Sequence, residues 1–289
     1  MKTILLAVAL LVPTVAEAKP REGDAVLFSK EGALWKVSAR GGTPEKIAEL
    51  DAHMKAAPVD RIEAAADGSV ALVRAGRARR VVTVAGGGVR GVGCGVGGGG
   101  DRELSWDGRQ VRCAVDGDTD VVDEGGKHWT ERVVERLPWL VGPGAKRAAA
   151  VEGDALVAFK LDARKARRIL LPKGVPVLWS ADGNWLLAHW TDLSHNQATC
   201  IVRAVGGEYK CWHGYTGVAI APDGSYCLLA KAGKIGHDLF VGELAGAQTE
   251  APAVLVRGAD GPAAWLGQPG PAPPPEAVTP GDEGEEGPE

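Results

Sequence analysis

Short apolar segments separated by glycine-rich turns recur along the chain, and helical periodicity is scarce. In the clearest copies, an apolar segment ends in a turn of the form Trp/Ile-x-x-Asp-Gly and a second apolar segment follows at once. Trp179–Gly183 stands in this way before Trp185–Ala188, and Ile220–Gly224 stands before Tyr226–Ala230. Alternating or continuous apolar runs bounded by Gly and Asp-Gly are typical of β-strands joined by tight turns. The pattern therefore predicts an all-β chain.

The turn recurs with a nearly fixed period. Weaker copies lie at 62–73, 104–115 and 139–151, the last with Gly142-Pro143-Gly144 as its turn. Gly68 and Gly108 are 40 residues apart, and Gly183 and Gly224 are 41 apart. A period of 40 to 45 residues with several short strands is typical of one blade of a β-propeller.

Each unit resolves into four strands, which we letter A (innermost) to D (outermost). The fifth unit is expected to contain strands at 177–180, 185–190, 199–204 and 208–212, and the sixth at 218–221, 226–231, 239–244 and 253–257. The first unit offers only B, C and D strands, at 25–29, 34–38 and 45–50, while an additional A-type strand lies near Ala263–Leu266. We therefore expect six four-stranded antiparallel blades, with the C-terminal strand joining the N-terminal blade to close the ring. If the second unit, blurred by Gly86–Gly100, fails to form, the ring has five blades or stays open.

The Trp-Ser-x-Asp-Gly turn, followed by an apolar strand, a Gly-Gly turn and a strand ending in Leu, resembles the WD-repeat-like units of the TolB-type periplasmic propeller. The resemblance covers residues 24–270. The motif is specific for the propeller fold and says little about function, because its Trp and its Asp-Gly turn are architectural in every copy. The TolB family carries a further α/β domain before its propeller, which these residues do not provide, so its partners are not transferred to particular positions here.

The two ends of the chain differ from its centre. Residues 1–18 combine Lys2, an apolar run and Ala16-Glu17-Ala18, the pattern of a cleavable signal peptide, so residues 19–267 are the expected propeller domain. No cysteine follows the cleavage site to carry a lipid anchor, and no later segment is apolar for long enough to span a membrane. Residues 268–289 hold Pro, Gly and six acids, and we expect a disordered tail. These features predict a periplasmic or secreted protein.

Charge excludes one class of partner. The formal net charge is −4, and without the six tail acids it is −4 + 6 = +2. A nearly neutral body lacks the concentrated basic surface that nucleic acids require. We therefore expect no nucleic-acid partner.

The cysteines suggest one disulfide and leave a second open. Cys200 and Cys211 flank the turn between strands C and D of the fifth unit, so they are expected to lie opposite each other on these strands. In an oxidising compartment, this spacing favours a disulfide between them. Cys94 and Cys113 are a further candidate pair, and Cys227 is expected to be a small buried hydrophobe.

Catalytic motifs are weak. His195 and His237 fall in equivalent loops of adjacent units, but no His-x-His or His-Glu-x-x-His spacing occurs, and we predict neither a metal nor a cofactor. No Gly-x-Ser-x-Gly elbow is present. Because some TolB-like propellers are lyases with a histidine-bound metal in the central channel, the alternative is a metal-dependent carbohydrate-active enzyme. The A strands at 177–179, 218–220 and 263–265 are apolar, which favours the non-enzymatic interpretation.

Binding groups are expected on the face that carries the B-to-C loops and the D-to-A connectors, because these are long and variable whereas the opposite turns are short and alike. The predicted binding residues are His53, Lys55, Asp192, His195, Asn196, Lys234, His237 and Asp238. The sequence thus predicts a scaffold that binds another envelope or secreted protein, or an envelope polymer. Tolerated insertions without a function are the alternative explanation of these loops.

Overall fold

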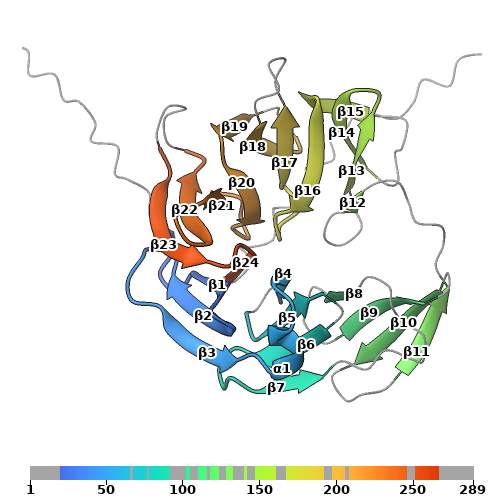
Figure 1. Ribbon diagram of the computed structural model, residues 1–289. Helices are drawn as coiled ribbons and strands as arrows, with labels where there is room; N and C mark the ends of the chain where they lie inside the picture. The colour runs from blue at the N-terminus through green and yellow to red at the C-terminus, as the bar shows by residue number, and fades with distance from the viewer. Residues whose placement is uncertain are drawn as a thin grey trace, which may run out of the picture.

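A computed structural model describes residues 20–65, 68–76, 78–91, 102–104, 110–115, 118–123, 128–132, 140–141, 147–160, 167–191, 197–205, 208–245 and 251–266. These residues form strands β1 to β24 and one short helix, α1 (Ala52–Lys55). The strands make six antiparallel sheets of four strands each, and Figure 1 shows one strand of every sheet turned toward a common centre. The all-β class predicted from the sequence is confirmed.

The sheets follow one another along the chain, and each runs from an innermost to an outermost strand. In that order, the first sheet contains β24 (Ala263–Leu266), β1 (Ala25–Lys30), β2 (Ala33–Ser38) and β3 (Glu45–Glu49). The second contains β4 (Val59–Ala64), β5 (Val70–Ala75), β6 (Ala78–Thr83) and β7 (Val89–Gly91). The third contains β8 (Arg102–Leu104), β9 (Gln110–Val115), β10 (Asp118–Asp123) and β11 (His128–Arg132). The fourth contains β12 (Leu140–Val141), β13 (Arg147–Glu152), β14 (Ala155–Lys160) and β15 (Arg167–Pro172). The fifth contains β16 (Gly174–Trp179), β17 (Trp185–Thr191), β18 (Gln197–Arg203) and β19 (Tyr209–His213). The sixth contains β20 (Thr216–Ile220), β21 (Tyr226–Ala232), β22 (His237–Glu243) and β23 (Ala253–Ala259).

The first sheet is built from both ends of the described chain. β24 pairs antiparallel with β1, with Val26 opposite Trp265. The predicted pairing of the C-terminal strand with the N-terminal unit is therefore present. The residues before β1 also contact the sixth sheet, because Arg21 forms an ion pair with Asp223.

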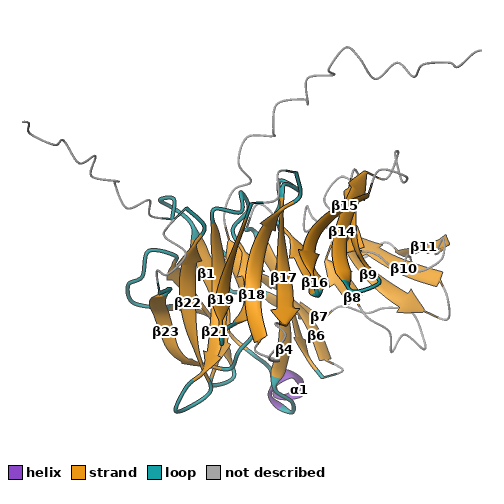
Figure 2. Cartoon of the chain, turned by 90° about the horizontal axis from the view of Figure 1, so that it is seen from above, coloured by secondary structure: helices purple, strands orange, loops and turns teal. Residues whose placement is uncertain are grey.

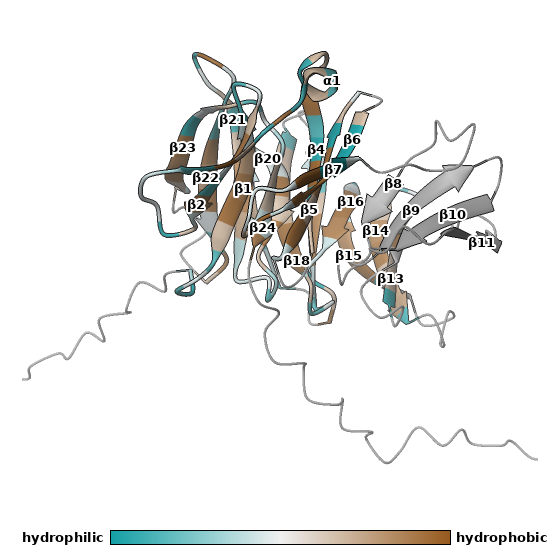
Figure 3. Cartoon of the chain, turned by 90° about the horizontal axis from the view of Figure 1, so that it is seen from below, coloured by the Kyte–Doolittle hydropathy of each residue, from teal (hydrophilic) through white to brown (hydrophobic). Residues whose placement is uncertain are grey.

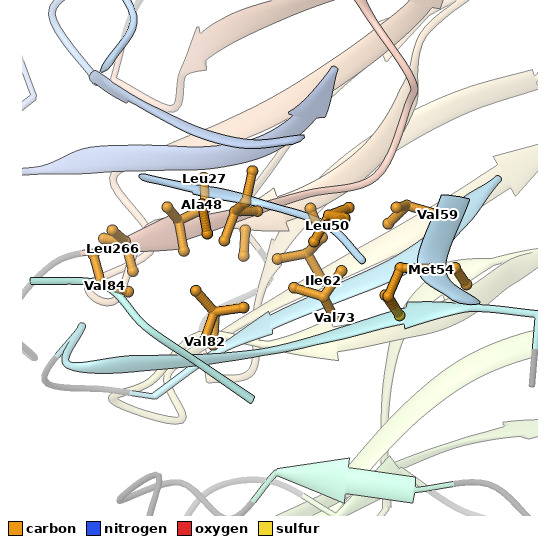
Figure 4. Close-up of a cluster of buried hydrophobic side chains, with 14 of the residues drawn as sticks. Leu27, Ala48, Leu50, Met54, Val59, Ile62, Val73, Val82, Val84 and Leu266 are labelled. Carbon is orange, nitrogen blue, oxygen red and sulfur yellow. The ribbon is translucent and has the colours of Figure 1, made fainter. Parts of the chain in front are cut away.

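Alternate side chains of each strand enter different cores, since successive residues point to opposite faces of a sheet. Leu27 of β1 packs between the first and second sheets, in the cluster shown in Figure 4. Val26 and Phe28 pack on the other face, against the sixth sheet. A strand buried on both faces reads as a continuous apolar run, and Figure 3 shows the apolar colouring running along the central strands.

The Asp-Gly turns share one set of hydrogen bonds. The N–H groups of Ala65, Ser180 and Ala221 donate to the carbonyls of Val70, Trp185 and Tyr226, five residues later in each case. The glycines Gly68, Gly183 and Gly224 have φ values of 70°, 69° and 74°, in the left-handed region that favours glycine. The repeat seen in the sequence is thus a repeat of one turn geometry.

Several boundaries and residues differ from expectation. β16 begins at Gly174 rather than 177, and the outer strand of the second sheet, β7, has three residues. The innermost strand β4 is not apolar, since Arg61 and Glu63 form an ion pair on it. The inner strands expected to be apolar were those at 177–179, 218–220 and 263–265, so the charge on β4 is a feature that this expectation did not cover.

The predicted disulfide between Cys200 and Cys211 is present, joining β18 to β19. Cys227 is a free, buried thiol, and burial raises its pKa. Cys94 and the side chain of Cys113 lie outside the described part of the chain, as do residues 1–18 and 268–289.

Candidate functional site

We call the face that carries the B-to-C loops and the D-to-A connectors the connector face. In Figure 2, α1 lies on one side of the molecule, and a loop near β21 protrudes on the same side. The connector 50–58 includes α1, and the loop 233–236 joins β21 to β22. The opposite face carries the Asp-Gly turns.

Helix α1 is a single turn whose N-terminus is fixed by one carboxylate. Asp51 caps it and accepts hydrogen bonds from the backbone N–H groups of His53 and Met54, at 3.0 Å each. Arg80 Nε donates to the same carboxylate at 2.5 Å. The Met54 N–H and Arg80 together hold the pKa of Asp51 below its usual range. The cap thus fixes the connector to β6.

Two of the predicted binding residues lie on this helix. His53 is exposed and, with Arg80, borders a shallow pocket floored by alanines (Ala56, Ala57, Ala75 and Ala78). Lys55 Nζ donates to Glu49 Oε2 at 3.1 Å. Hydrogen bonds from Lys46 and Lys55 lower the pKa of Glu49.

Of three others, Lys234 lies in the loop between β21 and β22, whereas His237 and Asp238, expected in that loop, are the first two residues of β22. Lys234 is exposed. Asp238 accepts from Arg257 Nη1 at 3.1 Å and from the Gly258 N–H at 3.2 Å, which ties the loop to β23. His237 is half-buried against Gly261, and its Nδ1 has no hydrogen-bond partner among the described residues.

The turn between β1 and β2 bridges the two groups. The carbons of Lys55 lie over Gly32, where a Cβ would stand 2.9 Å from Lys55 Cε. On the other side of the turn, Lys30 Nζ donates to the Arg257 carbonyl at 3.5 Å. A series of contacts therefore runs from Lys55 through the β1–β2 turn and Arg257 to Asp238. Asp192, His195 and Asn196 lie outside the described residues, so their position relative to this group stays a prediction.

Sequence reasoning missed three features of this face. The Asp51–Arg80 pair joins residues 29 apart in the chain, and the Lys30 contact joins residues 227 apart. Contacts between residues so far apart in the sequence leave no local pattern from which they can be predicted. Ile235, 81% exposed at the tip of the β21–β22 loop, did have a signal, because an isoleucine in a short loop of lysine and glycine is unusual.

An aromatic group also reaches the connector face beside the fifth and sixth sheets. Tyr215 packs edge-on against Phe240 with ring centroids 5.2 Å apart, and Lys231 Nζ lies 5.2 Å from the Tyr215 ring centroid. Trp190 contacts His213 edge-on at 5.9 Å. These rings fill the ends of the inter-sheet cores rather than a pocket.

Neither a metal-binding cluster nor a membrane-spanning helix occurs in the described part of the chain. Within these ranges, no three or more His, Cys, Asp or Glu side chains gather in a way that suits a metal ion. No helix among the same residues is long and apolar enough to cross a membrane.

Solved structures resemble this arrangement of sheets. TolB from Acinetobacter baumannii matches over 84% of this chain and 66% of its own length, with a TM-score of 0.58 and 13% identity. This chain therefore spans just under two thirds of that protein. A chain of a nidogen/laminin complex matches over 85% of this chain and 99% of its own, with a TM-score of 0.54 and 14% identity. The fold is that of a β-propeller. No protein-family model and no curated protein matches the chain, and at such identities the similarity concerns the fold.

Proposed function

We propose that the protein is an exported, non-enzymatic β-propeller that binds another envelope or secreted protein, or an envelope polymer, through its connector face. In this proposal the six sheets are six blades, and the pairing of β24 with β1 closes the ring. Residues 1–18 are the signal peptide, and the acidic residues 268–289 are a flexible extension. The propeller needs neither a cofactor nor a metal.

The observation that carries the proposal is the difference between the two faces. On the turn face, the same backbone hydrogen bonds recur at Ala65, Ser180 and Ala221, and they leave little freedom to vary. On the connector face, α1, the β1–β2 turn and the β21–β22 loop differ from one another and form one connected surface. Variable segments held on a rigid scaffold are where binding groups are usually displayed.

The similar structures add modest support. One belongs to TolB and another was solved in a complex named for two proteins, nidogen and laminin. Both are consistent with a propeller that serves as a protein-binding surface. Neither transfers a partner to this chain.

The test is a pull-down from envelope extract with residues 19–289 as bait. A connector-face variant carries His53→Ala and Lys234→Ala, both at exposed positions. A control variant removes two cations that do not contact the connector-face residues, with Lys36→Ala and Arg203→Ala, whose side chains are 34% and 47% exposed. Binding that survives in the control and falls in the connector-face variant supports the proposal. Equal loss in both variants, or capture of nothing by the unaltered protein, contradicts it.

The metal-dependent carbohydrate-active enzyme remains the second candidate. The charged strand β4, the innermost of the second sheet, favours it, because it carries Asp60, Arg61 and Glu63. Metal content of the purified protein and release of unsaturated sugars from envelope polysaccharides test it directly.

A further inference from the structure

The loop between β21 and β22 displays an apolar side chain to solvent. Ile235 is 81% exposed, more than any other large apolar residue in the described part of the chain. The next is Ile169, 67% exposed on the outer strand β15. Single exposed apolar residues are common on protein surfaces, so exposure carries an inference here only together with what surrounds it.

The loop that holds Ile235 is fixed on both sides. The Gly233 N–H donates to the Gly236 carbonyl at 3.0 Å, closing the loop on itself. Gly236 has a φ of 62°, and a Cβ there would collide with the Ala259 carbonyl oxygen, so the loop lies directly against the end of β23. Asp238 completes the attachment through its bonds to Arg257 and Gly258.

This arrangement is pre-organised. The backbone on each side of Ile235 is held by hydrogen bonds and close packing, so a partner that covers the side chain orders little else. Rigid presentation of this kind raises affinity by reducing the entropy lost on binding. A loop held in this way and tipped with isoleucine has the form of an interface anchor.

Charge indicates the chemistry of the partner. Lys234 adjoins Ile235, Lys231 lies at the end of the same hairpin, and the Arg257 side chain is 73% exposed. Asp238 is 19% exposed and bonded to Arg257, so these two charges offset each other, and Lys231 and Lys234 remain. Glu31 and Asp260 are the exposed acids of the adjoining turns. The cations nearest the isoleucine favour a partner surface that carries carboxylates around an apolar pocket.

We propose that Ile235 is the central anchor of the connector face and enters an apolar pocket, rimmed by carboxylates, on a partner protein. This inference rests on the proposed function and specifies its binding residue. A stable interface buries roughly 800 Å² per partner. Ile235 supplies its centre, while the β1–β2 turn and α1 supply the surrounding contacts. A lipid surface fits less well, since one isoleucine gives too little apolar area for stable insertion.

The experiment uses the mature protein with matched exposed substitutions. Ile235→Ser tests the anchor, Ile169→Ser is the control at a comparably exposed isoleucine, and Lys234→Glu tests the charge. All three variants should keep the thermal unfolding midpoint of the unaltered protein. A protein captured from envelope extract is identified by mass spectrometry, purified and titrated against each variant.

We expect Ile235→Ser to weaken binding of the purified partner at least about 10-fold, as for interface anchors generally. Ile169→Ser should leave it unchanged, and Lys234→Glu should slow association in a salt-dependent way. Equal binding by the Ile235→Ser and Ile169→Ser variants overturns the anchor and leaves the proposed function standing. If the unaltered protein binds no protein, both fall. If it instead sediments with phosphatidylglycerol vesicles and Ile235→Ser abolishes this, the protein-partner proposal is overturned in favour of a lipid surface.

Discussion

The side chain of Trp265 offers a direct test of how the first sheet is built. It is 7% exposed and packs between the first and sixth sheets, where its ring stacks on that of Tyr226 with centroids 6.2 Å apart. Replacing a buried tryptophan by alanine removes its contacts and leaves a cavity, at a cost of about 3 to 5 kcal/mol. The indole also interacts with the buried Asp24 carboxylate, so the loss of this polar contact places the expected cost in the upper part of that range.

Trp265→Ala is therefore expected to lower the free energy of unfolding by about 3 to 5 kcal/mol. Trp265→Phe keeps a ring against Tyr226 and should cost about 1 to 2 kcal/mol. Urea denaturation followed by far-ultraviolet circular dichroism measures both, with Val254→Ala as the control because Val254 is 48% exposed on the neighbouring strand β23. A cost below about 1 kcal/mol for Trp265→Ala would refute the reasoning, because β24 would then contribute little to the folded core.

Three further predictions concern other parts of the molecule. Replacing both Cys200 and Cys211 by alanine should cost about 2 to 3 kcal/mol, as expected for the short loop they close, and dithiothreitol should lower the thermal midpoint of the unaltered protein but not that of the variant. Burial, with the charge of Glu243, raises the pKa of Tyr226 from 10.0 to about 12. Folding therefore favours the neutral phenol. Its contribution to the free energy of unfolding is complete below pH 10 and is lost as the pH rises toward 12. Tyr226→Phe should flatten that alkaline loss in midpoints measured from pH 9 to 12, and parallel curves would contradict the assignment. Asp51→Ala should destabilise α1 locally by about 1 to 2 kcal/mol, which is measured as faster hydrogen exchange of the Met54 amide. Because the pKa of Asp51 is lowered in the folded protein, the protection of this amide from exchange in the unaltered protein should be present above the usual aspartate pKa. It should disappear as the pH falls through the lowered pKa of Asp51.

The strands were predictable where each unit repeats the same sequence pattern. β21 and β17 begin at Tyr226 and Trp185, as the pattern indicated, because an Asp-Gly turn fixes the residue at which the next strand starts. Gly174-Val175-Pro176 extends β16 backward without any repeated signal. Its pairing with β17 comes from the neighbouring strand rather than from local sequence.

The site was less predictable for a physical reason. Helix α1 has four residues, too few to show a helical period. It is capped by Asp51, whose carboxylate is in turn bound by Arg80 of strand β6. His53 and Lys55 could be chosen because they lie in an irregular connector. The contacts that unite them with Asp238, through Gly32, Lys30 and Arg257, depend on how the first sheet packs beside the sixth.

The repeated Asp-Gly turns make the fold predictable from the sequence, and they also limit which positions can be substituted to change binding. A change in an Asp-Gly turn disturbs bonds such as those of Ser180, whose hydroxyl and backbone both engage Trp185. A change at the Ile235 side chain leaves the bonds of the loop in place, because these are made by the glycines around it. Selection for a partner can therefore act on Ile235 and its cationic neighbours at little cost in stability. It cannot act so freely on the turn face, where each substitution is opposed by the loss of folding energy.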